Sequence, residues 1–215
     1  LLLNISELGA TNKQRSEEPL DVAIVHFDLE KEWDLSRVKE AINFHIRGDE
    51  QLPIPSQIVV LDVERAADDF NARFDAKGRH YIFRIINRRG HLALDGNRAW
   101  CVPEKLDIEK MRAAAKLLIG KHDFTSFRST SCQSKSPIKT LDALDITEQG
   151  EEIIITCNAL SFLHHQVRNM VGSLKLVATG KWQVEDVQKA LDARDRRAAG
   201  PTAPAQGLYF VKVEY

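Results

Sequence analysis

The chain has 215 residues, of which 43% are hydrophobic and three are cysteines. This size and composition fit one large globular domain or two small ones. No apolar run approaches the roughly 20 residues that cross a bilayer, and no cysteines form a Cys-x-x-Cys pair, which argues against a membrane span, a disulfide framework and a zinc knuckle. We therefore expect a cytoplasmic protein with reduced thiols.

The net charge of −1 conceals a marked asymmetry along the chain. Residues 1–70 contain 7 basic and 15 acidic side chains, whereas residues 71–215 contain 23 and 16. The basic residues of the second part form local clusters, which are Arg73, Lys77, Arg79, Arg84, Arg88 and Arg89, followed by Arg128, Lys135 and Lys139. This distribution predicts that a polyanion binds mainly to the second part. Nucleic acid is favoured over a membrane surface because no amphipathic helix carries a continuous basic face.

The first 70 residues contain three predicted elements after an irregular start. Residues 1–8 resemble a helix fragment, and residues 9–19 are polar and lack periodicity. A β-branched run predicts a strand over residues 22–27, and another strand is predicted over residues 58–63. Between them Asp34 is expected to cap a helix. The apolar face of this helix comprises Leu35, Val38, Ile42 and Ile46.

The second part alternates helical and strand patterns. Strands are predicted over residues 81–86, 142–147, 151–157 and 208–215, with a turn at Gln149 and Gly150 between the middle two. Helices are predicted over residues 107–120, 161–179 and 184–194, and residues 200–207 form a loop. Helices interleaved with hairpin-like strands indicate an α+β fold in which helices cover mainly antiparallel sheets.

One segment, FLHHQVRNMVG at residues 162–172, places polar groups within an apolar helical pattern. The predicted buried face comprises Leu163, Val167, Met170, Val171 and Leu174. A neighbouring stripe at spacings of three and four comprises His164, Arg168, Gly172 and Lys175. This stripe is either an ordinary solvated face or a wall that holds a guanidinium at the edge of the core.

Four segments together, in this order and spacing, resemble the tRNA pseudouridine synthase A (TruA) family. They are RHYIFRI at residues 79–85, KHDFTSFRSTSCQSKSPIKTL at 121–141, FLHHQVRNMVGSL at 162–174 and GLYFVKVEY at 207–215. The resemblance extends from about Val22 to the last residue. It implies an isomerase that converts uridine to pseudouridine in the tRNA anticodon stem-loop, at positions 38–40, by base flipping and without cofactor or metal.

The resemblance also implies an architecture. We expect two α+β domains of the pseudouridine synthase fold, over residues 1–70 and 71–215, each a mainly antiparallel sheet covered by helices. The first domain is expected to be incomplete in this sequence. The domains would meet at a basic RNA-binding cleft, and a homodimer would bind one tRNA across both subunits.

Two residues match catalytic positions of the family. Tyr81 matches the tyrosine that stacks on the target uracil and whose hydroxyl helps remove a proton from the new carbon link. On strand periodicity alone Tyr81 would instead be a core residue, because Phe83 and Ile85 share its face. Arg168 matches the arginine that pairs with the catalytic aspartate, a role suited to a permanently charged planar fork.

Further residues match regions that lie near the RNA. These substrate-binding candidates are Phe127, Arg128, Lys135, Lys139 and His164, together with Tyr81. For each lysine a solvated loop is an equally simple interpretation, since exposed lysines are common. His164 and His165 could instead suggest a metal-dependent hydrolase, but adjacent histidines point in different directions on a helix and no ligand pattern completes a site.

The sequence departs from the family at its nucleophile. The family aspartate lies in a Gly-Arg-Thr-Asp-Ala-Gly-Val-His-Ala loop upstream of the strand that here ends at residues 25–28, and no such loop is present. Counting back from His26 reaches Arg15, and Asp21 lies in the wrong register. Either the loop belongs to a longer natural sequence, or the protein is a divergent, noncatalytic tRNA-binding or RNA-folding protein. The retention of Tyr81 and Arg168 favours the first explanation.

Overall fold

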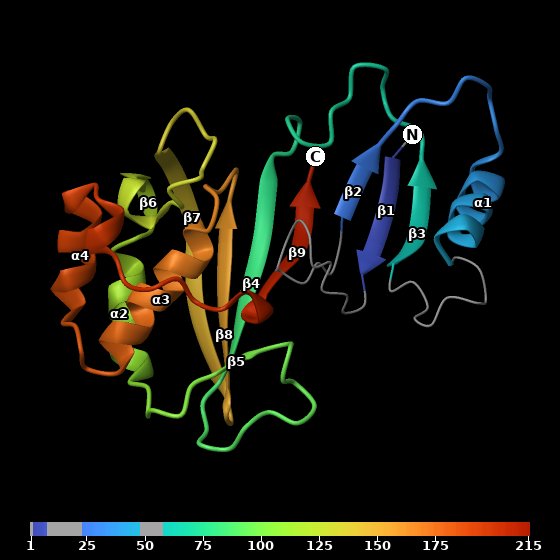
Figure 1. The fold of residues 1–215 in the computed structure, drawn as a ribbon. Helices are drawn as coiled ribbons and strands as arrows, with labels where there is room; N and C mark the ends of the chain where they lie inside the picture. The colour runs from blue at the N-terminus through green and yellow to red at the C-terminus, as the bar shows by residue number, and fades with distance from the viewer. Residues whose placement is uncertain (1, 8–22, 48–57) are drawn as a thin grey trace.

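The computed structural model describes residues 2–7, 23–47 and 58–215, which form two sheets and four α-helices (Figure 1). The strands are β1 (Leu2–Glu7), β2 (Ala23–His26), β3 (Ile58–Glu64), β4 (Gly78–Ile86), β5 (Trp100–Cys101), β6 (Gly120–Asp123), β7 (Ile138–Gln149), β8 (Glu152–Ala159) and β9 (Leu208–Glu214). The helices are α1 (Leu35–Arg47), α2 (Ile108–Lys116), α3 (Gln166–Ala178) and α4 (Val184–Ala193), with short 3-10 turns η1 (Thr125–Phe127), η2 (Arg196–Ala198) and η3 (Ala205–Gly207). No helix in these ranges is long and apolar enough to cross a membrane.

The smaller sheet has the order β2-β1-β3, and both neighbours run antiparallel to β1. The predicted cap of α1 is confirmed, because a carboxylate oxygen of Asp34 accepts a hydrogen bond from the Arg37 amide at 3.1 Å. Val38 of α1 is buried with Val60 and Val63 of β3, so the predicted apolar face packs on this sheet.

The helix fragment predicted for residues 1–8 is wrong, since Leu2–Glu7 forms the central strand of this sheet. So short an apolar run has no decisive period, and pairing with a strand on each side settles its conformation. Arg15 and Asp21 lie outside the described residues.

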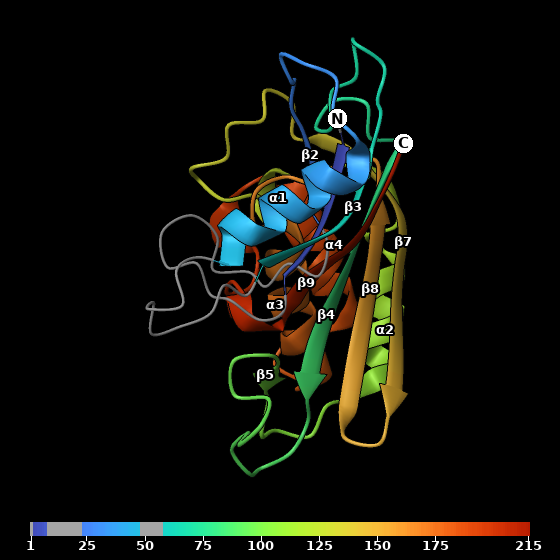
Figure 2. The same ribbon diagram turned by 90° about the vertical axis from the view of Figure 1, so that its right-hand side faces the viewer.

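The larger sheet has the order β5-β4-β8-β7-β6, with β9 also paired to β4. All its pairings are antiparallel except the short contact between β4 and β5. Alternate residues of β8 are buried, because one face of the sheet packs against the helices while the other does not. Figure 2 shows β4, β8 and β7 of this sheet in front and α2, α3 and α4 behind them. The core between these layers includes Phe83, Ile155, Met111 and Leu174.

Two predicted boundaries in the second part of the chain require small corrections. The β7–β8 turn lies at Gly150 and Glu151, one residue later than predicted, and Gly150 has a φ of 64° that favours glycine. Helix α2 begins after the predicted cap Asp107 but ends at Lys116. Gly120, expected to end that helix, instead begins β6. The short strands β5 and β6 have too few residues to show a period.

The largest boundary error is at the start of α3, which begins at Gln166 rather than Ser161. His165 adopts a left-handed conformation, with φ 62°, that cannot continue a helix. The Gln166 side chain accepts a hydrogen bond from the Leu163 amide at 2.9 Å and so stabilises the preceding turn. His164 therefore precedes the helix, although Leu163 is buried as expected.

Candidate functional site

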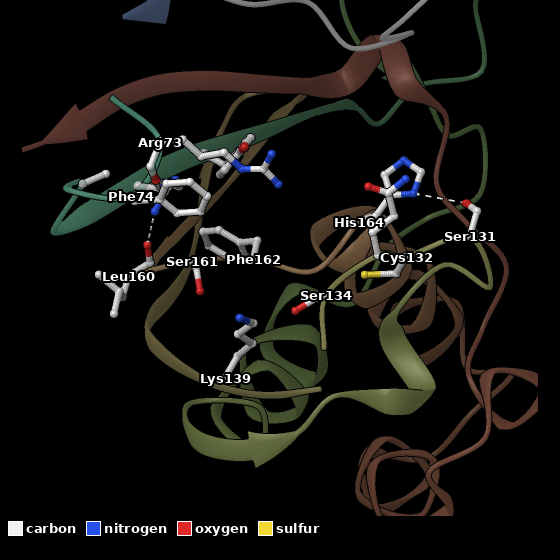
Figure 3. Close-up of a pocket in the computed structure, with 14 residues that line it drawn as sticks. Arg73, Phe74, Ser131, Cys132, Ser134, Lys139, Leu160, Ser161, Phe162 and His164 are labelled. Carbon is white, nitrogen blue, oxygen red and sulfur yellow. Dashed lines mark hydrogen bonds between the residues drawn. The ribbon is translucent and has the colours of Figure 1, made fainter. Parts of the chain in front are cut away.

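A cavity of about 800 Å³ opens where three segments distant in sequence converge. Its lining comes from residues 73–81, 131–139 and 160–164 (Figure 3). Arg73, Phe74, Leu160 and Phe162 gather at one end, while His164 and Ser131 lie at the other. Of the sequence-predicted site residues, the cavity brings together Tyr81, Lys139 and His164. The residues described as its lining do not include Phe127, Arg128, Lys135 or Arg168.

Tyr81 lies where β4 passes from the core into the cavity. Phe83, two residues on, is fully buried, whereas Tyr81 is half-buried and lines the cavity. Its ring meets Phe162 edge-on at 5.1 Å and lies 5.0 Å from the ring of Phe210 on β9. The core and site interpretations of Tyr81 are therefore compatible, because packing against two rings orients the residue at the cavity wall.

His164 and His165 lie in the turn before α3. Their rings are 3.9 Å apart and inclined by 36°, so the expectation that they point in different directions is wrong. That expectation assumed that both residues lie in a helix, but the left-handed conformation of His165 breaks the helical geometry at this point. The His164 ring lies 3.4 Å from the Ser131 hydroxyl, which links two walls of the cavity. Within the described ranges, no group of three histidine, cysteine or acidic residues is placed to bind a metal ion.

Arg168 is buried, with only 8% of its surface exposed, which excludes the solvated-face interpretation for this residue. Its Nε donates a hydrogen bond to the Ala203 carbonyl at 2.8 Å, and its own carbonyl accepts one from the Ala203 amide at 3.1 Å. Two members of the polar stripe, Arg168 and Gly172, thus face the loop over residues 199–204, whereas Lys175 pairs with Glu104 at 2.8 Å. Gly172 is needed there, since a Cβ atom would lie 1.7 Å from the Pro201 carbonyl oxygen.

Phe127 and Arg128 lie in and after the η1 turn. The Phe127 side chain is fully buried, with its ring 6.2 Å from that of Phe124, so it does not reach the cavity. Arg128 follows it half-buried. Asp123, the last residue of β6, accepts hydrogen bonds from the amide and hydroxyl of Thr125 in this turn. Burial raises the pKa of Asp123, but these hydrogen bonds and the nearby Arg194 and Arg128 outweigh burial and lower the pKa overall. Lys135 is exposed and Lys139 half-buried in the loop and strand that follow.

Four arginines of the basic cluster predicted over residues 73–89 fall into two pairs. Arg73 and Arg79 line the cavity. Arg84 instead forms an ion pair with Glu152 at 2.6 Å, and Arg88 pairs with Glu151 at 3.2 Å. Burial lowers the pKa of Arg84, yet the hydrogen bond with Glu152 makes the net change a rise. The cluster is therefore less available to a polyanion than its sequence density suggests.

Three site-forming residues were not predicted as such. Arg79 lies on the same face of β4 as Tyr81, but the strand was predicted to begin only at residue 81 and so left Arg79 outside it. Phe74 is exposed at the cavity and carried no periodic signal. Asn169 is fully buried, and its amide donates to the Phe127 carbonyl at 2.8 Å while its oxygen accepts from Thr202 at 2.7 Å. Its presence in an apolar helix was the signal that could have identified it.

Comparison with known proteins finds similar sequences. A family model described as tRNA pseudouridine synthase matches residues 114–215. A protein of Paramagnetospirillum magneticum named tRNA pseudouridine synthase A is 52% identical over 192 residues, covering 89% of this chain and 72% of the relative. Proteins of the same name from Azorhizobium caulinodans and Maricaulis maris are 52% and 48% identical, again over 89% of this chain and over 72% and 74% of their own lengths.

Identity at this level extends over nearly the whole chain, including all three segments that line the cavity. The resemblance noted in four separate motifs is thereby confirmed. This chain belongs to the tRNA pseudouridine synthase A family.

Proposed function

We propose that this protein is a tRNA pseudouridine synthase that isomerises uridine to pseudouridine in the anticodon stem-loop, at positions 38–40. The observation that carries the proposal is the cavity in which the half-buried ring of Tyr81 lies with Phe162 and the cations Arg73 and Lys139. An aromatic wall suits a planar uracil, and cations suit the phosphates on each side of it. A cavity of about 800 Å³ has room for one nucleotide.

The reaction requires that the target nucleotide leave the base stack, at a cost of roughly a few kcal/mol. In the proposed mechanism, an aspartate carboxylate attacks the flipped nucleotide and the N-glycosidic bond breaks. The detached uracil rotates, and its carbon 5 bonds to the ribose while the bond to the aspartate breaks. The proton on that carbon then leaves with help from the Tyr81 hydroxyl, and the former glycosidic nitrogen takes up a proton. Bonds broken and formed balance, so the isomerisation needs no cofactor. No described residue is assigned as the aspartate.

Arg168 is proposed to orient that carboxylate. Its Nε hydrogen bond to Ala203 fixes the plane of the guanidinium, which suits a group that must present a fork in one direction. A buried position also strengthens its attraction to a carboxylate, because little water screens the pair.

The other candidates have separate proposed roles. Arg128, Lys135 and Lys139 would contact phosphates, and His164 would contact the nucleotide from the end of the cavity opposite Phe74. Phe127, whose side chain is enclosed, would act only by placing Arg128.

The wider architecture remains part of the proposal. We expect domains over residues 1–70 and 71–215 that meet at a basic cleft, a homodimer, RNA binding, and a cytoplasmic location. Contacts of each sheet with the segment that connects β3 to β4 support a defined arrangement. The His26 ring meets Phe70 edge-on at 6.2 Å, and the Tyr215 hydroxyl donates to the Ala72 carbonyl at 2.8 Å.

Tritium release from uridine labelled at carbon 5 in an unmodified tRNA transcript tests the proposal. Protein expressed from the complete gene should release tritium with no added metal and equally in the presence of a chelator. Bound tRNA without release would instead support the noncatalytic RNA-binding alternative, which the family membership does not favour. Release that a chelator abolishes would require a metal-dependent mechanism.

A further inference from the structure

We propose that Phe74 is a stacking platform for the nucleobase next to the flipped uridine, and that Arg79 positions this platform. The inference rests on the proposed function, since it assigns a neighbouring part of the same substrate. It adds a specificity-determining contact outside the residues that match the family's catalytic positions.

Phe74 is unusual in its exposure. The side chain is 76% exposed, although it lines the cavity, and Leu160 beside it is 55% exposed. Large apolar side chains that gather at the rim of a polar cavity indicate a binding contact more often than isolated ones do. The two residues form what we call the apolar rim.

The backbone that presents Phe74 is braced by its own turn. The Asn71 carbonyl accepts hydrogen bonds from the amides of Phe74 and Asp75, at 3.1 and 2.9 Å. The Asp75 carboxylate in turn accepts from the Asn71 amide at 2.6 Å. An exposed ring on so constrained a turn loses little entropy on binding, which favours affinity.

Arg79 joins the two halves of the apolar rim. One terminal nitrogen of its guanidinium donates to the Leu160 carbonyl and the other to the Arg73 carbonyl. A planar fork can bridge two carbonyls in this way, whereas an ammonium group cannot reproduce the geometry. Arg79 therefore fixes the segment before β4 relative to the segment after β8, and we assign it a positioning role.

The chemistry at the rim selects a nucleobase as the occupant. The Arg73 guanidinium carbon lies 5.6 Å from the centre of the Phe74 ring, so an aromatic face and a cation are presented together. This pairing suits single-stranded nucleic acid, in which bases stack on rings and phosphates meet cations. Tyr81 lies deeper and is half-buried, so it suits the flipped base, while the exposed Phe74 suits a base that stays outside. A base that loses its flipped neighbour exposes one face, which Phe74 would cover.

A double-mutant cycle between protein and RNA tests this contact. The parent and Phe74→Ala would each be measured with intact tRNA and with tRNAs abasic at the 5′ or the 3′ neighbour of the target uridine. Both kcat/KM and the Kd for tRNA would be recorded. For the parent, removal of the contacted base should lower kcat/KM and raise the Kd for tRNA roughly tenfold, as expected for one base–aromatic stack. The same removal should have little effect on either constant for Phe74→Ala. The inference would be overturned if the effects of Phe74→Ala and of base removal on kcat/KM and on Kd were additive at both neighbours.

The chain offers a matched control in Phe44 of α1, which is 75% exposed and lies outside the described cavity linings. Phe44→Ala should show no coupling to either abasic site. Arg79→Lys retains the charge but should reduce the coupling, and full parental coupling in this variant would remove its positioning role. The parent's tritium release separately reports the proposed function, and the Kd cycle tests the Phe74 contact even if release is absent.

Discussion

The guanidinium of Arg168 is buried, and a charge in such a position is energetically unfavourable. Burying a charged group costs several kcal/mol unless hydrogen bonds and an opposite charge offset it, and the Ala203 carbonyl supplies one such bond. Tyr81 is placed differently, at the edge of an apolar surface with rings on two sides. Each residue combines a structural contact with a proposed chemical role, so substitutions must separate the two.

Replacing Arg168 should separate turnover from binding. Arg168→Ala should abolish turnover yet retain most tRNA affinity, because phosphate contacts elsewhere supply binding. Loss of the buried hydrogen bond should also lower the free energy of unfolding by about 2 kcal/mol. Arg168→Lys keeps the charge without the fork and should lose turnover by at least about 100-fold. Single-turnover rates, urea unfolding and tRNA Kd would be compared. Turnover at the parental rate in either variant would remove Arg168 from the mechanism.

Replacing Tyr81 by phenylalanine should isolate the contribution of its hydroxyl to the reaction rate. Tyr81→Phe preserves the ring that packs against Phe162 and Phe210, so stability and tRNA affinity should change little. Loss of the hydroxyl should slow the final removal of the proton by roughly 100-fold, a typical contribution of one positioned acid–base group. Single-turnover tritium release measures that step. Unchanged kinetics would show that only the ring matters.

At the scale of elements, α3 and the loop over residues 199–204 form one unit. Gly172 permits the close approach of Pro201, and the Ser173 hydroxyl accepts a hydrogen bond from the Gly200 amide at 2.9 Å. Asn169 joins this unit to η1 through the Phe127 carbonyl. The helix therefore positions both Arg168 and Arg128 through backbone contacts.

Gly172→Ala sets two effects of opposite sign against each other. Helix propensity alone would stabilise the fold by up to about 1 kcal/mol. The added Cβ would lie 1.7 Å from a backbone oxygen, so the loop must move, and we expect a net destabilisation of about 2–3 kcal/mol. Urea unfolding measures the change. Gly90→Ala, whose Cβ would have only an arginine Nε within 4.0 Å, should be near neutral. A stabilised Gly172→Ala variant would contradict the close packing.

The η1 turn should depend on the charge of Asp123. Because the folded-state pKa of Asp123 is lowered, its stabilising effect is present above the unfolded-state value of about 4 and is lost as pH falls through the folded value. Asp123→Asn should therefore be less stable than the parent at pH 7 by about 1 kcal/mol. The difference should shrink between about pH 5 and pH 2. A difference that stays constant over this range, by urea unfolding, would contradict the charge effect.

For the whole molecule, long elements were predictable and contact-dependent features were not. The strand alternation at Tyr81 and the cap at Asp34 are local, and the sequence showed both. The strand Leu2–Glu7 depends on partners on both sides, and the left-handed His165 depends on its turn, so neither has a local signature. The cavity combines three segments that 49 and 20 intervening residues separate along the chain. The catalytic candidates Tyr81 and Arg168 were identified by motif resemblance, whereas the proposed roles of Phe74 and Arg79 could be assigned only from the structure.

The division of charge across the molecule predicts how tRNA binding responds to salt. Lys139 lines the cavity and Lys135 is exposed beside it, so both can neutralise phosphates, whereas Lys189 on α4 pairs with Asp186 at 2.7 Å. Each phosphate contact contributes roughly 0.7 to 0.9 to the slope of log K against log salt. The double variant Lys135→Ala/Lys139→Ala should therefore reduce the slope by about 1.5, while Lys189→Ala leaves it unchanged. Binding isotherms between low and moderate salt measure both slopes. A reduction by Lys189→Ala of about half that in the double variant, in proportion to the charge removed, would mean that net charge, rather than a basic cleft beside the cavity, governs tRNA binding.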